Sequence, residues 1–286
     1  MFEKITIIGC GLMGGSFALG LRQAVGVKEI VGFSPSGKST EKALEMGVID
    51  FACTSPIEAV LGSDLVLIAV PVAATFKILE MIEPALEART LIMDVGSTKT
   101  NVLKAAHDAL GGKISSFVGA HPIAGKEKSG VSHADAALYF NRQVILTPDT
   151  STKLIKVEQA RSVWEALGCQ VREMSASDHD QALAAVSHLP HLLSFGLMHT
   201  ITEQINAELL LSLAGPGFSD STRIAASDPH IWSDIFLANQ GPLLTLSQQV
   251  RENLQTFENA ILEGDKKTLQ DLISKASETR ENWNMQ

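Results

Sequence analysis

The sequence has few cysteines, no long apolar run and no excess of positive charge. Its three cysteines, Cys10, Cys53 and Cys169, form no CxxC pair, which favours reduced thiols in a cytoplasm over a disulfide framework or a zinc site. No apolar segment reaches the roughly 20 residues that span a bilayer, so we expect no membrane partner. The formal net charge of −9 argues against nucleic acid, because binding a phosphate backbone requires a basic face.

Targeting signals, internal repeats and charged tails are also missing. The N-terminal segment, MFEKITIIGCG, carries neither a basic region nor a small-residue cleavage site, so we interpret it as the first strand of a cytoplasmic protein. A hydrophobic content of 45% with 19% charged residues is typical of a globular protein, and 286 residues are enough for two domains.

Apolar strand-like runs alternate with helical patterns in the first part of the chain. The predicted strands are 5–9, 29–33, 64–70, 90–95, 115–120, 143–148 and 169–174. This alternation predicts a parallel sheet covered by helices on both faces. From residue 178 onward the pattern is helical and predicts no strand. We therefore predict an α/β domain at residues 1–175, followed by an all-helical domain at residues 176–286.

The motif GCGLMG, which begins at Gly9, matches the GxGxxG pattern of dinucleotide-binding proteins. It follows a predicted strand and opens a helix, as this pattern requires, and therefore predicts a Rossmann-type domain. Its glycines permit a tight turn and close approach of the backbone to a pyrophosphate, although an ordinary strand–helix turn is the alternative. We predict cofactor contacts from this turn and from the end of the third strand: Gly9, Gly11, Leu12, Met13, Gly14, Val70 and Pro71.

No acidic residue follows the second predicted strand, where NAD-binding proteins usually place an Asp or Glu that binds the adenosine ribose. The segment GFSPSGKST offers hydroxyl groups and one lysine instead. A carboxylate would repel a 2′-phosphate, whereas these groups could donate hydrogen bonds to one, so we predict a preference for NADP. The predicted donors are Ser34, Ser36, Lys38 and Ser39. The segment lacks arginine, and a solvated loop that also accepts NAD is the alternative.

Ser97 and His121 are predicted at the carboxyl edge of the sheet, where an α/β domain binds its ligands. Ser97 and Lys99 follow the fourth predicted strand and are expected to face the nicotinamide half of the cleft. His121 follows the fifth, and Pro122 restricts its backbone to extended conformations. An imidazole with an ordinary pKa of about 6.5 can accept a proton from a hydroxyl group as a hydride leaves. A turn histidine bonded to the backbone is the alternative.

The helical part contains two histidine motifs, DHD and SHLPH, and a loop that ends at Arg223. The motifs lack a further acid or cysteine at ligand spacing, and Pro190 disturbs the helix, so we predict no metal site. A polar substrate pocket, or a helix N-cap at Asp178 or Asp180, fits better. Arg223 would supply the local cation that an acidic protein needs for a carboxylate substrate, although a surface arginine is the alternative.

Four blocks of the sequence together closely resemble the prephenate/arogenate (cyclohexadienyl) dehydrogenase family of tyrosine biosynthesis. The blocks are GCGLMGGS, GAHPIAGKEKSGV, DHDQALAAVSHLPHLLSFGL and GPGFSDSTRIAASDPHIWSDIFLAN, in this order over nearly the whole chain. The resemblance implies oxidative decarboxylation of a small dicarboxylate, prephenate or arogenate, with hydride transfer to the nicotinamide of the cofactor. It also implies that the helical domain binds substrate and joins a homodimer. We expect no additional regulatory domain.

The resemblance implies roles for individual residues. His121 matches the catalytic histidine that takes the proton of the ring hydroxyl, and Ser97 matches a serine that orients this hydroxyl. Arg223 matches an arginine that binds a substrate carboxylate. Other matches are Ser187 and His191 in the pocket, Glu127 and Asp220 in an ionic group that gates it with Arg223, and Trp232, which reaches the neighbouring subunit's site.

Lys126 departs from the family's pattern, because some relatives carry a small hydroxyl residue there. Arogenate has an ammonium group where prephenate has a keto group, so a lysine disfavours arogenate, while the adjacent Glu127 offsets it. Prephenate is therefore the favoured substrate, with arogenate as the alternative.

Two other functions agree with parts of the sequence. A β-hydroxyacid dehydrogenase or imine reductase shares the two-domain plan and NADP, but uses a lysine in the first helix of its second domain, where this chain has histidines. A non-catalytic protein that senses NADP would keep the glycine turn without needing the serine, histidine and arginine residues named above.

Overall fold

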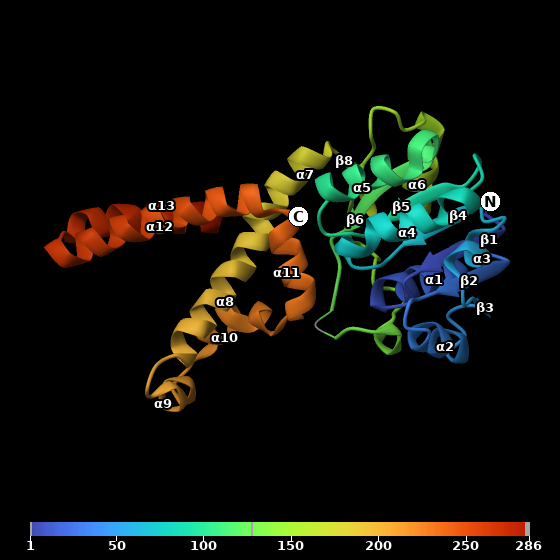
Figure 1. Ribbon diagram of the computed structural model, residues 1–286. Helices are drawn as coiled ribbons and strands as arrows, with labels where there is room; N and C mark the ends of the chain where they lie inside the picture. The colour runs from blue at the N-terminus through green and yellow to red at the C-terminus, as the bar shows by residue number, and fades with distance from the viewer. Residues whose placement is uncertain (1, 127, 284–286) are drawn as a thin grey trace. The chain divides into compact units, whose positions relative to one another are not determined.

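The computed structural model describes residues 2–126 and 128–283 (Figure 1). Contacts divide the chain into a first unit, Met1–Asn239, and a second unit, Gln240–Gln286. The sequence-based boundary near residue 175 follows the change from strands to helices, and it stays a prediction.

An eight-stranded sheet with the order β3-β2-β1-β4-β5-β6-β7-β8 forms the centre of the first unit. The strands are β1 Lys4–Ile8, β2 Glu29–Phe33, β3 Phe51–Ala52, β4 Leu65–Ile68, β5 Leu91–Asp94, β6 Phe117–Pro122, β7 Gln143–Thr147 and β8 Gln170–Glu173. After β1, the strands β2 and β3 are added on one side of it. The next strand, β4, lies on the other side of β1, and β5 to β8 continue from there. The carboxyl ends of β1 and β4 therefore form the switch point at which such sheets bind ligands.

The predicted strands are all present, with ends displaced by at most two residues. Two features differ from the prediction. The strand β3 lies at the edge of the sheet and was not predicted, because its two exposed residues, Phe51 and Ala52, are too few to show a strand pattern. The strands β6 and β7 pair antiparallel, with His121 opposite Ile145, whereas the other neighbouring strands pair parallel. Among the described residues between β6 and β7, the helical structure is a short 3₁₀ turn, Val131–His133, whereas a parallel crossover usually requires a full helix.

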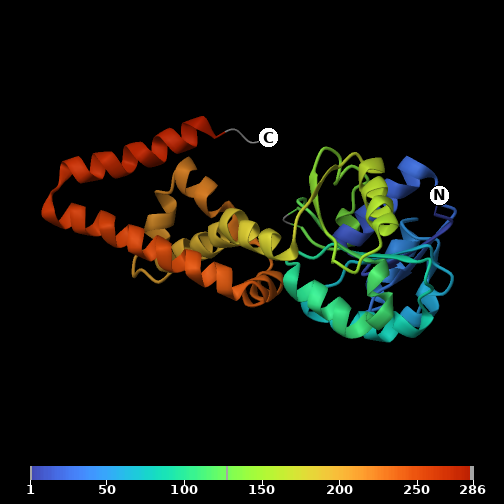
Figure 2. The same cartoon turned by 90° about the horizontal axis from the view of Figure 1, so that it is seen from above.

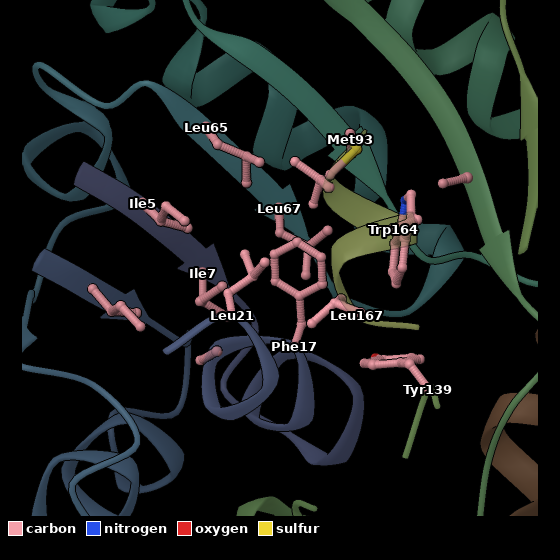
Figure 3. Packing of buried hydrophobic residues seen from close by; sticks show 14 of the residues in the cluster. Ile5, Ile7, Phe17, Leu21, Leu65, Leu67, Met93, Tyr139, Trp164 and Leu167 are labelled. Carbon is pink, nitrogen blue, oxygen red and sulfur yellow. The ribbon is translucent and has the colours of Figure 1, made fainter. Parts of the chain in front are cut away.

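Helices cover both faces of the sheet (Figure 2). They are α1 Leu12–Val25 and α6 Leu154–Ala166 on one face, and α4 Thr75–Ile82 and α5 Thr100–Leu110 on the other. Alternate residues of β4 point to opposite faces, so that Leu67 packs in the cluster of Phe17 and Trp164 (Figure 3), whereas Ile68 packs in the cluster of Ile78. Burial of each large apolar side chain contributes about 1.5–3 kcal/mol to folding.

The remaining helices of the first unit follow β8. They are α7 Ala176–Leu183, α8 Leu189–Thr202, α9 Ala207–Ser212, α10 Pro216–Thr222 and α11 Pro229–Ala238, while α2 Lys38–Glu45 and α3 Pro56–Val60 lie between the early strands. A π-helical turn, Ala184–His188, joins α7 to α8 just before Pro190. Proline lacks an N–H group and clashes with the carbonyl four residues earlier, so the wider turn accommodates the disturbance expected at Pro190.

The second unit consists of α12 Gln240–Glu263 and α13 Lys266–Asn282, which contact each other and form a hairpin whose turn contains Gly264 (Figure 2). Gly264 has a φ of 66°, in the left-handed region that glycine adopts readily at the end of a helix. Between residues 178 and 283 the structure contains no strand, as predicted. Within the described parts of the chain, no helix is both long and apolar enough to cross a membrane.

Candidate functional site

The glycine turn after β1 has two positions that exclude a side chain and one that is open. Gly9 has a φ of 104°, and a Cβ atom there would lie 2.3 Å from the Ala69 carbonyl oxygen. A Cβ atom at Gly14 would lie 2.2 Å from the Gly9 carbonyl oxygen. Gly11, the N-cap residue of α1, has a φ of −93° and would place a Cβ atom more than 4 Å from its neighbours. The turn is therefore closely packed at Gly9 and Gly14, whereas space remains beside Gly11 at the N-terminus of α1.

Gly11, the open position, precedes the first turn of α1, and this helix N-terminus could bind a diphosphate. No side chain caps α1 at Gly11, and the first turn contains no acidic residue, so its N–H groups and the positive end of the helix dipole are available to an anion. The turn contacts Ala69, which precedes Val70 and Pro71 at the end of β4. The residues present thus fit a pyridine dinucleotide, with its pyrophosphate held by the glycine turn.

Ser34 connects the glycine turn to the end of β2. Its Oγ atom accepts a hydrogen bond of 2.8 Å from the Cys10 backbone N–H, and the residue is 7% exposed. The hydroxyl proton of Ser34 remains available to a further acceptor. Ser36 and Lys38 are exposed and Ser39 is partly exposed. These four residues follow one another around the turn at Gly37, which has a φ of 68°.

A buried ion pair fixes the backbone beside His121. The Asp94 carboxylate accepts hydrogen bonds from the backbone N–H groups of Gly96, at 2.7 Å, and Ala120, at 3.0 Å. The Lys99 ammonium pairs with Asp94 and donates a hydrogen bond of 2.9 Å to the Ala120 carbonyl oxygen. Burial lowers the pKa of Lys99, and the adjacent carboxylate opposes this shift. The pair therefore joins the carboxyl ends of β5 and β6.

His121 and Ser97 lie in the segments that this ion pair anchors. Both are partly exposed, His121 as the fifth residue of β6 and Ser97 in the turn between β5 and α5. His121 therefore presents an imidazole at the carboxyl edge of the sheet, as predicted.

His121 is hydrogen-bonded to the helical part of the first unit. Its Nδ1 atom lies 2.8 Å from Nε2 of His179, whose Nδ1 atom lies 2.8 Å from Oδ1 of Asp180. The Asp180 carboxylate also accepts hydrogen bonds of 2.8 Å from the backbone N–H groups of Lys99 and Thr100, at the start of α5. His179 and Asp180 are buried. The predicted N-cap at Asp178 or Asp180 was wrong for α7, because the Ser175 side chain caps this helix by accepting a hydrogen bond from the Asp178 N–H. Asp180 caps α5 instead.

The pKa shifts of His121, His188 and Asp180 favour neutral imidazoles at the two histidines and an ionised carboxylate. Burial lowers the pKa of His121 well below its usual value, the positive charge of Lys99 adds to this shift, and the Asp180 carboxylate opposes it. Burial also lowers the pKa of His188, to about 4. Burial acts to raise the pKa of Asp180, but its hydrogen bonds from His179 and from the start of α5 lower it below the usual range. At neutral pH His121 is therefore unprotonated and ready to accept a proton.

Asn239 connects Asp180 to a second histidine. Its side-chain amide nitrogen donates a hydrogen bond of 2.7 Å to the Asp180 carbonyl oxygen and lies 3.0 Å from Nδ1 of His188. All three residues are buried. No sequence motif singled out Asn239, and its role emerges only from its buried position at the end of α11.

Two of the residues predicted for the substrate site, His191 on α8 and Trp232 on α11, are in contact. His191 stacks on Trp232 with ring centroids 3.4 Å apart, and its Nδ1 atom lies 2.9 Å from the Ser187 carbonyl oxygen. Burial lowers the pKa of His191, the hydrogen bond to Ser187 opposes this shift, and the positive charge of Arg223 adds to it. Arg223 therefore lies close enough to His191 to influence it, although its own side chain is exposed. Trp232 thus contacts a pocket residue of its own chain.

Three residues predicted for the substrate site take no part in the contacts of His121 or His191 described above. Lys126 forms an exposed ion pair of 2.9 Å with Asp135. Asp220 is exposed on α10. Glu127 lies outside the described residues. Across the described residues, no group of three or more His, Cys, Asp or Glu side chains is placed to hold a metal ion.

Two family models match the chain. The model of the prephenate dehydrogenase nucleotide-binding domain matches residues 17–173, and the model of the prephenate dehydrogenase dimerization domain matches residues 175–275. Prephenate dehydrogenase of Bacillus subtilis is 38% identical over 85% of this chain and 66% of that protein. Cyclohexadienyl dehydrogenase of Zymomonas mobilis is 33% identical over 93% of this chain and 90% of that protein.

Solved structures are similar over nearly the whole chain. Prephenate dehydrogenase from A. aeolicus, in complex with hydroxyphenyl propionate and NAD+, has a TM-score of 0.91 and 33% identity, and the match covers 98% of each chain. Synechocystis arogenate dehydrogenase has a TM-score of 0.83 and 28% identity, and the match covers 98% of this chain and 100% of that one.

Proposed function

Because this chain belongs to the prephenate dehydrogenase family, we propose that it oxidises and decarboxylates a cyclohexadienyl dicarboxylate, prephenate or arogenate, in tyrosine biosynthesis. It is an NAD(P)-dependent oxidoreductase. The observation that carries the proposal is the imidazole of His121 at the carboxyl edge of the dinucleotide-binding sheet, where it is hydrogen-bonded to His179.

The chemistry divides between the cofactor and the side chains of the site. A bound pyridine nucleotide supplies the acceptor for the hydride that leaves the ring carbon bearing the hydroxyl group. His121 accepts the proton of this hydroxyl group, and Ser97 orients it. Arg223 binds a substrate carboxylate, for which the planar guanidinium is suited. Loss of the ring carboxylate as CO2 then leaves an aromatic ring, which drives the reaction forward.

We propose prephenate as the preferred substrate and a homodimer as the working form. The ammonium of Lys126 would oppose that of arogenate, but its ion pair with Asp135 reduces this effect, so the preference is expected to be modest. The match to a dimerization domain at residues 175–275 supports residues 176–286 as the substrate and dimerisation domain. The ionic group of Glu127, Asp220 and Arg223, and the reach of Trp232 to a neighbouring subunit, belong to this proposal.

The proposal is tested by the reduction of NADP with prephenate, measured beside NAD and beside arogenate. Turnover with prephenate and NADP would support the reaction and the cofactor preference together. Turnover with arogenate alone would keep the reaction and reject the preference argued from Lys126. Tight NADP binding without reduced cofactor or CO2 in any combination would favour a non-catalytic NADP-binding protein.

Changing Ser34 to Asp is expected to shift cofactor preference toward NAD. A carboxylate at this position would repel a 2′-phosphate, and about 1.4 kcal/mol of repulsion changes a ratio of efficiencies tenfold. The side chain of Asp could still accept the hydrogen bond from the Cys10 N–H, so the turn should persist. We expect kcat/KM for NADP relative to NAD to fall about tenfold or more. Ser34→Thr keeps the hydroxyl group and should keep the ratio; an unchanged ratio in Ser34→Asp would contradict the NADP assignment.

Changing Arg223 to Ala is expected to act mainly on substrate affinity. The guanidinium is exposed, so the loss of its carboxylate contact should cost about 1–2 kcal/mol, less than a fully desolvated pair would. We expect KM for prephenate to rise about tenfold, with a smaller change in kcat. Arg251→Ala removes an exposed arginine of α12 and serves as the control. An unchanged KM in Arg223→Ala would place the carboxylate elsewhere.

A further inference from the structure

The partners of Asp180 determine which nitrogen of His179 carries a proton. The Asp180 carboxylate accepts hydrogen bonds from the backbone N–H groups of Lys99 and Thr100, which can only donate. These bonds stabilise the ionised form, which can only accept. Because Nδ1 of His179 lies 2.8 Å from Oδ1 of this carboxylate, Nδ1 must donate and therefore carries the proton.

The tautomer of His179 in turn determines which nitrogen of His121 carries a proton. A neutral imidazole has one N–H group, so the Nε2 atom of His179 carries a lone pair. Nδ1 of His121 lies 2.8 Å from this lone pair and must donate to it. The lone pair of His121 is then on Nε2.

We propose that Asp180, acting through His179, fixes the tautomer of His121 so that Nε2 is the atom that accepts the substrate's proton. His179 and Asp180 are positioning residues, because they act through His121. When Nε2 of His121 takes a proton, the new positive charge lies within a hydrogen-bonded series that ends at a carboxylate. Asp180 also caps α5, which follows the turn that carries Ser97, so one carboxylate orders both residues of the proposed reaction.

The test replaces Asp180 with Asn and rests on the proposed function only for its kinetic part. The amide oxygen can keep the hydrogen bond from the Thr100 N–H, whereas a nitrogen in the place of Oδ1 can only donate and no longer accepts from the Lys99 N–H or from Nδ1 of His179. If this nitrogen faces Nδ1 of His179, both histidines change tautomer and Nε2 of His121 carries a proton that blocks acceptance. A wrong tautomer in a comparable carboxylate–histidine arrangement costs about 10⁴ in kcat. We expect kcat to fall by about 10²–10⁴ and KM for the nucleotide to change less than about threefold.

Nitrogen-15 NMR of histidine-labelled protein provides a readout that a merely structural role would not move. In the native protein without substrate, we expect protons on Nδ1 of both His121 and His179; in Asp180→Asn we expect them on Nε2. Asp178→Asn is the matched control: the same substitution on α7, at an exposed side chain bound to Ser175, should leave the tautomers and kcat unchanged.

The possible results separate the two proposals. A proton on Nε2 of His121 in the native protein, or native kcat in an Asp180→Asn protein whose histidines have changed tautomer, would overturn the inference. If Asp180→Asn does not fold or keeps the native tautomers, the tautomer of the native protein decides the question alone. If the native protein fails to turn over prephenate or arogenate, the proposed function is wrong, while the NMR result still supports or overturns the tautomer assignment.

Discussion

Changing His121 to Asn is expected to lower kcat by about 10²–10⁴ while leaving nucleotide binding nearly unchanged. Asparagine has no basic nitrogen, so the hydroxyl proton would have no acceptor at this position, and this is the loss typical of a general base. The glycine turn follows β1, and β4 and β5 separate β1 from the strand of His121. Three strand spacings amount to about 14 Å, so the substitution should not disturb the turn. Steady-state kinetics and a direct measurement of NADP binding check both expectations.

His107→Asn provides the control for this prediction. His107 lies near the end of α5, with its Nε2 atom 3.1 Å from an Asp149 carboxylate oxygen, and takes no part in the hydrogen bonds of His121. We expect its kcat to equal that of the native protein. Near-native kcat in His121→Asn would remove His121 from the chemistry.

The strands and the glycine turn could be predicted because their signals are local. Apolar runs identified the strands from β1 to β7 except β3, which has only two residues and is too short to show a pattern, while β8 was predicted from the mixed segment CQVREM. The direction of β7 could not be predicted in this way, since periodicity is the same in parallel and antiparallel strands. The available signal was the connection from β6 to β7, in which the described residues form no long helix.

The contacts of His121 depend on residues far away in the sequence and could not be predicted from local patterns. His179 is 58 positions from His121, and Asn239 is 59 positions from Asp180. A substrate pocket at the DHD motif stays a prediction, and the local pattern suggested a cap for the motif's own helix, which was wrong. The capping of α5 by Asp180 requires the two helices to pack together, which the sequence does not encode in any short segment.

Changing Gly14 to Ala is expected to lower the free energy of unfolding by about 3 kcal/mol, at the upper end of the usual cost of overpacking. The new Cβ atom would lie 2.2 Å from the Gly9 carbonyl oxygen and 2.7 Å from a methyl group of Ile7, so the backbone of the turn would have to move. This cost arises although alanine favours a helix over glycine by about 1 kcal/mol. Urea unfolding of the native and variant proteins measures the difference, and dinucleotide binding should weaken with it.

Gly11→Ala in the same motif should behave in the opposite way. A Cβ atom there meets no protein atom within 4 Å, and the φ of −93° suits alanine, so the stability should fall by only about 1 kcal/mol, the usual cost of an N-cap alanine. The methyl group would, however, occupy the space through which a pyrophosphate approaches the first turn of α1. We expect the Kd for NADP, measured by calorimetry, to rise about 10- to 100-fold, which corresponds to about 1–3 kcal/mol. Native affinity in Gly11→Ala would contradict a diphosphate at this turn. A loss of stability in Gly14→Ala together with a loss of affinity in Gly11→Ala would instead show that the fold requires Gly14 and that the ligand requires Gly11.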